Sequence, residues 1–166
     1  MAAPRRRDPS LVAPDTHGAV PGAFAFQVPS DARCRLIPLR NASTLPLSIS
    51  NAWIRTPGPL VGIATGVVSN LWVVEVGPNG SDWWDVHHHQ LPTTRTYENP
   101  SAGLQLFFTH GHGIPSTRGR LHKGVDTHSD GSHVVFWFAA GFECLDHETP
   151  QQFPDWLRAA LTEPAP

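Results

Sequence analysis

The side chains of this chain that could do chemistry are clustered histidines and one short basic run. Ten histidines occur among 166 residues, including a run at His87–His89 and a pair at His110 and His112. A zinc site needs three or four convergent ligands held by outer hydrogen bonds. The sequence contains neither His-Glu-x-x-His nor Cys-x-x-Cys, so we interpret the histidines as surface polar residues.

The basic run, Arg118–Lys123, is the candidate for holding phosphate. It places two arginines and the single lysine within six residues, in a stretch that we expect to be a glycine-containing loop. The sequence has no Gly-x-x-x-x-Gly-Lys-Ser/Thr, which excludes a P-loop. The formal net charge of -2 argues against a nucleic-acid binder driven by overall basicity, but it leaves a local basic patch open. A merely solvated loop is the alternative.

The elements that must position these groups form a single strand-dominated domain. Six Trp and eight Phe are too many apolar side chains to leave in water, which excludes a wholly disordered chain. The longest apolar stretch, Val134–Phe142, is about half of the ~18–20 residues that a membrane-spanning helix needs. We therefore predict a globular domain without a membrane partner.

The domain is predicted to occupy residues 31–162. Residues 1–30 read as a poorly ordered arm, because proline recurs there too often for a helix to propagate, and residues 163–166 read as a tail. The expected strands are 33–39, 61–66, 71–76, 93–98, 104–109, 125–127 and 133–140, and the expected helices are 82–90 and 153–161. This order predicts an α+β fold with a mixed or antiparallel central sheet and few short helices.

Cysteine use and the N-terminus bear on location. Cys34 and Cys144 are the only cysteines. They leave a single disulfide or two free thiols open, and the latter is usual in a reducing cytosol. Arg5–Arg7 is not followed by the apolar run of a signal peptide, so a cytoplasmic location is expected.

Four segments in a fixed order carry a family resemblance. Gly-Ile-Ala-Thr-Gly at 62–66 is followed by a hydrophobic strand that ends in Glu-Val-Gly-Pro at 75–78. Gly-Leu-Gln-Leu-Phe-Phe follows at 103–108 and Gly-Val-Asp-Thr-His at 124–128. Together with Ile-Pro-Leu at 37–39, this order resembles the N-terminal bifunctional DNA primase/polymerase (prim-pol) domain of the archaeo-eukaryotic primase superfamily. The resemblance runs from about Arg33 to Phe138.

The resemblance implies site residues by position. The family has Asp-x-Asp-Pro, Gly-x-His-x-aromatic-Phe and Gly-x-Asp-x-Arg at these places. It therefore implies Glu75 and Asp126 as catalytic acids and as ligands of Mg²⁺ or Mn²⁺. The implied nucleotide-binding residues are Gln105, His128, Arg118, Arg120 and Lys123. From the residues alone, the favoured interpretation of the two acids is different: solvated acids at a sheet edge, or salt-bridge partners of Arg95, Arg118 or Arg120.

The chain departs from the family at several of these places. Gly77 replaces the second acid and offers no ligand, and Gln105 replaces the histidine. His128 replaces the arginine, so that its positive charge depends on pH. Nucleotidyl transfer usually relies on two divalent ions, and losing one charge-stabilising group commonly costs on the order of 10²–10³ in rate. We therefore expect a weakly active or inactive domain.

The expected partners follow from the same resemblance. They are a nucleotide and a DNA or RNA end, with a helicase or another replication protein encoded separately. One alternative is an active divergent primase-polymerase, in which Asn79, Asp82 or Asp85 supplies the missing ligand. Another is a non-catalytic interaction module that keeps the fold. Phe107 is either a stacking surface for a base or part of the core.

Overall fold

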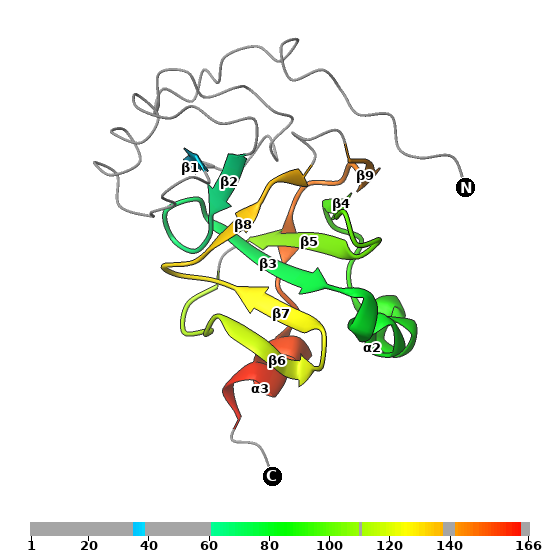
Figure 1. Ribbon diagram of the computed structural model, residues 1–166. Helices are drawn as coiled ribbons and strands as arrows, with labels where there is room; N and C mark the ends of the chain where they lie inside the picture. Colours follow the sequence, from blue (N-terminus) through cyan, green and yellow to red (C-terminus); the bar gives the residue numbers. More distant parts are fainter. Residues whose placement is uncertain (1–34, 39–60, 110, 138–141, 164–166) are drawn as a thin grey trace.

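Two sheets and a few short helices make up the α+β fold (Figure 1). The computed structural model describes residues 35–38, 61–109, 111–137 and 142–163. The larger sheet has the strand order β6-β7-β3-β5-β4-β9. These strands are β6 (Thr117–His122), β7 (Val125–His128), β3 (Leu71–Val76), β5 (Leu104–Thr109), β4 (Thr96–Glu98) and β9 (Cys144–Asp146). They pair antiparallel, and β10 (Gln151–Gln152) adds a parallel pair to β5, which confirms the predicted mixed or antiparallel sheet.

A smaller antiparallel sheet contains β1 (Arg35–Pro38), β2 (Val61–Ala64) and β8 (His133–Val135). Aromatic side chains join it to the larger sheet. The ring of Phe136 lies 5.1 Å from that of Tyr97, which in turn lies 5.3 Å from Phe107, both edge to face. All three are fully buried. Phe107 is therefore core, and a stacking role for it on a base is excluded.

Helices cover the opposite face of the larger sheet. They are α2 (Ser81–His87) and α3 (Asp155–Thr162), with 3-10 turns η2 (Pro78–Gly80) and η3 (His88–Gln90). Successive side chains of a strand point to opposite faces. Trp72 and Val74 of β3 thus pack with Leu157 and Leu161 of α3, while Glu75 faces the other way. Within the described residues, neither helix has the length and apolarity to cross a bilayer.

The predicted elements agree with the structure best where the sequence pattern is strongest. The bounds of β3 and β5 are those predicted, and the α3 and β7 segments lie within two residues of the prediction. The helix predicted at 82–90 is divided into α2 and the 3-10 turn η3. The prediction of a loop at Arg118–Lys123 was wrong. Arg118 to His122 belong to the edge strand β6, and Lys123 lies in the turn that follows it. Ser81 is the first residue of α2 and not its cap, which is Gly80. The short strands β9 and β10 were not predicted.

Other expectations fall outside the described residues. These are the arm at 1–30 and the end of the strand predicted to reach Ala140. Cys34 likewise lies outside the described residues. Cys144 lies within them and carries a free thiol.

Candidate functional site

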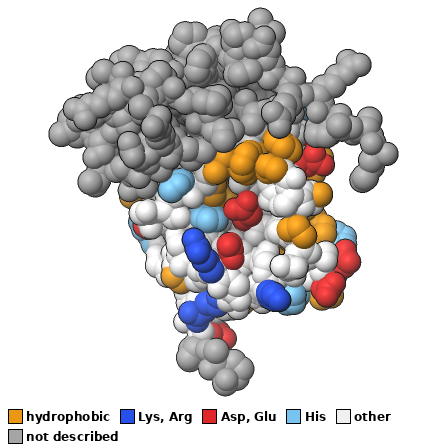
Figure 2. Space-filling model, in the orientation of Figure 1, with side chains coloured by type: hydrophobic (Ala, Val, Ile, Leu, Met, Phe, Trp, Pro, Cys, Tyr) orange, Lys and Arg blue, Asp and Glu red, His pale blue; other side chains and the backbone are white. Residues whose placement is uncertain are grey.

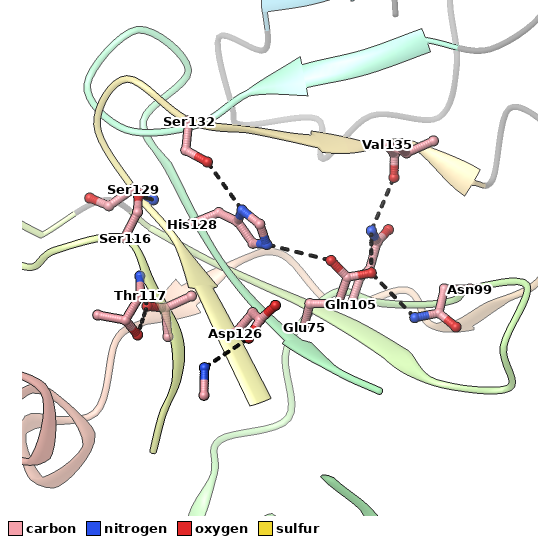
Figure 3. Close-up of polar contacts among 12 residues, drawn as sticks. Glu75, Asn99, Gln105, Ser116, Thr117, Asp126, His128, Ser129, Ser132 and Val135 are labelled. Carbon is pink, nitrogen blue, oxygen red and sulfur yellow. Dashed lines mark hydrogen bonds and ion pairs between the residues drawn. The ribbon is translucent and has the colours of Figure 1, made fainter. Parts of the chain in front are cut away.

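The two predicted acids lie side by side on neighbouring strands. In β3, Glu75 pairs directly with Asp126 of β7 on one side and with Gln105 of β5 on the other. Directly paired residues share a face of the sheet, with Cβ atoms about 4.5–5.5 Å apart. Figure 3 shows Glu75, Gln105 and Asp126 from these three strands side by side. We call Glu75, Gln105, Asp126 and His128 the polar row.

His128 joins the row because it follows Asp126 by two positions and so shares its face. Its Nε2 lies 3.4 Å from Glu75 Oε2, and its Nδ1 lies 3.1 Å from Ser132 Oγ. This contact is an ion-pair distance, charged only when the imidazole is protonated, since Nε2 itself is buried and makes no hydrogen bond within the described residues. The side chains of His128 and Glu75 are 21% and 29% exposed, which leaves the pair accessible from solvent.

The turn between β7 and β8 holds Ser132 against His128. Thr65 donates from Oγ1 to the Ser129 carbonyl at 2.6 Å and from its backbone N–H to the Ser132 carbonyl at 3.0 Å. Gly66 follows with φ +87°, and a Cβ there would collide with the backbone of Asp130. The Gly-Ile-Ala-Thr-Gly segment therefore allows one turn to approach the other closely, and this contact fixes the imidazole.

Two amides hold the second oxygen of Glu75. Asn99 Nδ2 donates to Oε1 at 3.3 Å and Gln105 Nε2 at 3.5 Å. Gln105 is fully buried and also donates to the Val135 carbonyl in β8 at 3.0 Å. Asn99 was missed in the sequence analysis. Its position before Pro100 is a turn signal that could have directed attention to it.

The basic residues of β6 diverge. Arg118 is exposed and pairs with Asp126 across β6 and β7, and the Gly119 N–H donates to Asp126 Oδ1 at 2.9 Å. Arg120 donates to the Glu163 carbonyl just after α3 at 2.6 Å, away from the polar row. Lys123 is exposed in the turn that joins β6 to β7. Figure 2 shows acidic, basic and histidine side chains gathered on one face.

The next residues considered in the sequence analysis, an arginine, two aspartates and a histidine, do not join the polar row. Arg95 is buried and donates to the carbonyls of Glu148 and His147 at 2.6 and 2.7 Å, so it pairs with neither acid. Asp82 and Asp85 are exposed on α2, and no contact of theirs with the polar row is seen in the described part of the chain. His87 donates from Nδ1 to the Trp83 carbonyl at 2.8 Å and stacks on the Trp156 ring.

The donor set of the polar row does not fit a pair of divalent cations. Mg²⁺ and Mn²⁺ prefer several oxygen ligands. Within residues 61–109, 111–137 and 142–163, no group of three or more His, Cys, Asp or Glu is placed to hold a metal ion. Gly77, two positions after Glu75, contributes no side chain. Oε1 of Glu75 already accepts from two amides, and Oε2 lies 3.4 Å from the His128 imidazole.

The comparison with family models decides the relationship. The model for bifunctional DNA primase/polymerase, N-terminal, matches residues 15–156. The chain belongs to this family. The comparison with curated proteins gave no match. The prim-pol match covers more of the chain than the resemblance read from its motifs, since it begins inside the predicted arm and ends in α3.

Members of the prim-pol family are typically metal-dependent primases and polymerases. Glu75 and Asp126, which the resemblance implies as the first and third acids, lie in direct register on neighbouring strands. That these two positions form the site, with Gly77 in place of the second acid, stays a prediction.

His133 is expected to make the stability of the domain depend on pH. Burial and the charge of nearby His128 lower the pKa of His133 from its ordinary 6.5. The unfolded chain therefore takes up the proton first, and stability is lost as the pH falls through 6.5. Urea unfolding at pH 7.5, 6.5 and 5.5 should show a smaller loss for His133→Gln than for the natural chain. The exposed His89→Gln is the control, and equal losses in all three proteins would contradict the prediction.

Proposed function

We propose that this prim-pol domain binds a nucleotide or a nucleic-acid end at the polar row and synthesises nucleic acid weakly or not at all. The single observation that supports weak synthesis is Gly77, which directly follows β3, two positions after Glu75, and offers no second carboxylate there. Phosphoryl transfer needs the charge on the phosphoryl oxygens to be balanced, and one lost stabilising group costs on the order of 10²–10³ in rate.

The proposal of retained binding is supported by the side chains around the polar row. Arg118 is exposed next to Asp126, and Lys123 is exposed at the end of the same hairpin. Their positive charges would attract a phosphate bound at the polar row. In the cell, the domain would act in the cytoplasm beside a separately encoded helicase or other replication protein, with synthesis supplied elsewhere.

Primer extension tests the weak-synthesis part. The full chain is incubated with primer-template, labelled dNTPs and Mn²⁺. We expect little or no extension above a reaction without protein. Robust extension that disappears in Asp126→Ala would contradict the proposal and establish the alternative, an active divergent primase-polymerase.

Two arginines of one strand test the binding part. Arg118→Ala should weaken binding of a labelled single-stranded oligonucleotide and lower the slope of log K against log salt by about 1, because one phosphate contact is lost. Arg120→Ala is the matched control, since its guanidinium binds the Glu163 carbonyl. Fluorescence anisotropy between about 50 and 200 mM salt measures both. Equal effects of the two variants would place the ligand elsewhere. No binding by the natural chain would favour an interaction module.

A further inference from the structure

Three groups of this chain surround the carboxylate of Glu75. Asn99 and Gln105 donate to Oε1 at 3.3 and 3.5 Å, and the imidazole of His128 lies 3.4 Å from Oε2. The two amides are hydrogen-bond donors, whereas Nε2 of His128 is at ion-pair distance only. Glu75 thus contacts protein groups on both oxygens before any ligand arrives.

Each of these groups is itself held in place. Ser132 contacts the far nitrogen of the His128 ring at 3.1 Å. The Asn99 carboxamide oxygen accepts from the Gly103 N–H at 2.8 Å, and Gln105 also donates to the carbonyl of Val135. Val135 belongs to the smaller sheet, so the network around Glu75 connects both sheets. A preorganised network of this kind is costly to break.

A cation at Glu75 would have to break this network. An Mg²⁺ ion lies about 2.1 Å from its oxygen ligands, whereas Nε2 of His128 stands 3.4 Å from Oε2 and two amides donate to Oε1. The ion would compete with the imidazole for Oε2 and with the amides for Oε1. Because Gly77 adds no second carboxylate, the ion would gain little in exchange for the lost hydrogen bonds.

We propose that Glu75 is a structural anchor between the sheets, and that ligand binding on this face does not need a divalent cation. The second clause rests on the proposed function. Binding without a cation has a consequence for Asp126, which pairs directly with Arg118 in the register of β7 and β6. In a cation-bridged site this carboxylate attracts the phosphate through the metal, whereas without a cation it repels phosphate directly.

The first experiment measures binding of a fluorescein-labelled single-stranded DNA oligonucleotide to the full chain. Affinities are compared in EDTA and in Mn²⁺ at matched ionic strength. We expect equal affinities within about twofold and tighter binding by Asp126→Asn in both buffers, because a repulsive charge is removed. Binding that is about tenfold tighter in Mn²⁺, with this gain lost in Asp126→Asn, would overturn the proposal.

The second experiment needs no nucleic acid. In thermal unfolding, Mn²⁺ should leave the Tm of the natural chain unchanged. Glu75→Gln should lower it, because a neutral amide oxygen accepts from Asn99 and Gln105 more weakly than a carboxylate does. Asp126→Asn, which keeps an oxygen for the Gly119 N–H, should lower it less. A Tm raised by Mn²⁺ would refute the structural role of Glu75. A Tm raised by Glu75→Gln would refute it too, because this is the result expected if Glu75 were an unpaired metal-ligand carboxylate repelled by Asp126. Failure of DNA binding would contradict the proposed function alone, since this measurement still decides the role of Glu75.

Discussion

Replacing Gly77 with aspartate is expected to create a divalent-cation site and to raise primer extension by about 10²-fold, the usual effect of one preorganised charge-stabilising group. The new carboxylate would stand two positions after Glu75 and therefore on the same face of β3. The backbone permits it, since Gly77 has φ -87° and ψ 179°, a conformation open to any residue. A Cβ there meets only the Gly124 carbonyl, at an ordinary 3.5 Å.

The matched control is Gly77→Asn, which has nearly the same size and no charge. Mn²⁺ binding is followed by titration calorimetry, and extension is measured on primer-template with labelled dNTPs. The aspartate variant should bind Mn²⁺ and extend the primer, while the asparagine variant should do neither. If both variants behave alike, or if the aspartate variant folds but binds no Mn²⁺, the missing carboxylate is not what limits synthesis.

Gly103→Ala is expected to destabilise the domain by about 2–4 kcal/mol, as a forced backbone displacement does. A Cβ at Gly103 would overlap the carbonyl oxygen of Val76 and lie 2.8 Å from Nδ2 of Asn99. The first contact is with the backbone of the central strand, which cannot rotate away. The second displaces the amide that donates to Glu75.

Gly77→Ala is the control for Gly103→Ala, because both glycines adjoin the same end of β3 and only Gly103 has no room for a methyl group. Urea unfolding should show the control within about 0.5 kcal/mol of the natural chain, the usual range for a change that disturbs no packed feature. A Gly103→Ala variant as stable as the control would mean that β5 can move away from β3. The placement of Asn99 beside Glu75 would then lose its support.

Under our proposal, Gly77 leaves Glu75 without a second carboxylate beside it, and groups of the chain itself balance its charge. The longer side chain of Glu75 reaches both an imidazole on β7 and amides from β5 and the turn before it. The proposal thus gives the first acidic position, an aspartate in the family motif, a structural use.

The sequence by itself determined the family, the α+β class and the central strands. Leu71–Val76 and Leu104–Thr109 have strong local patterns, and local patterns are what a sequence displays directly. The motif order also named Glu75, Gln105, Asp126 and His128, and the strand register brings these four together.

Only the tertiary structure decided what these residues contact. Arg118–Lys123 reads as a loop because its glycine and charged residues lack an apolar alternation, but pairing with β7 makes it an edge strand whose two arginines diverge. The contact of Asn99 with Glu75 joins residues 24 positions apart, and the Gln105 bond to Val135 crosses between sheets. Such contacts depend on strand register and on the packing of distant segments, which no local pattern encodes.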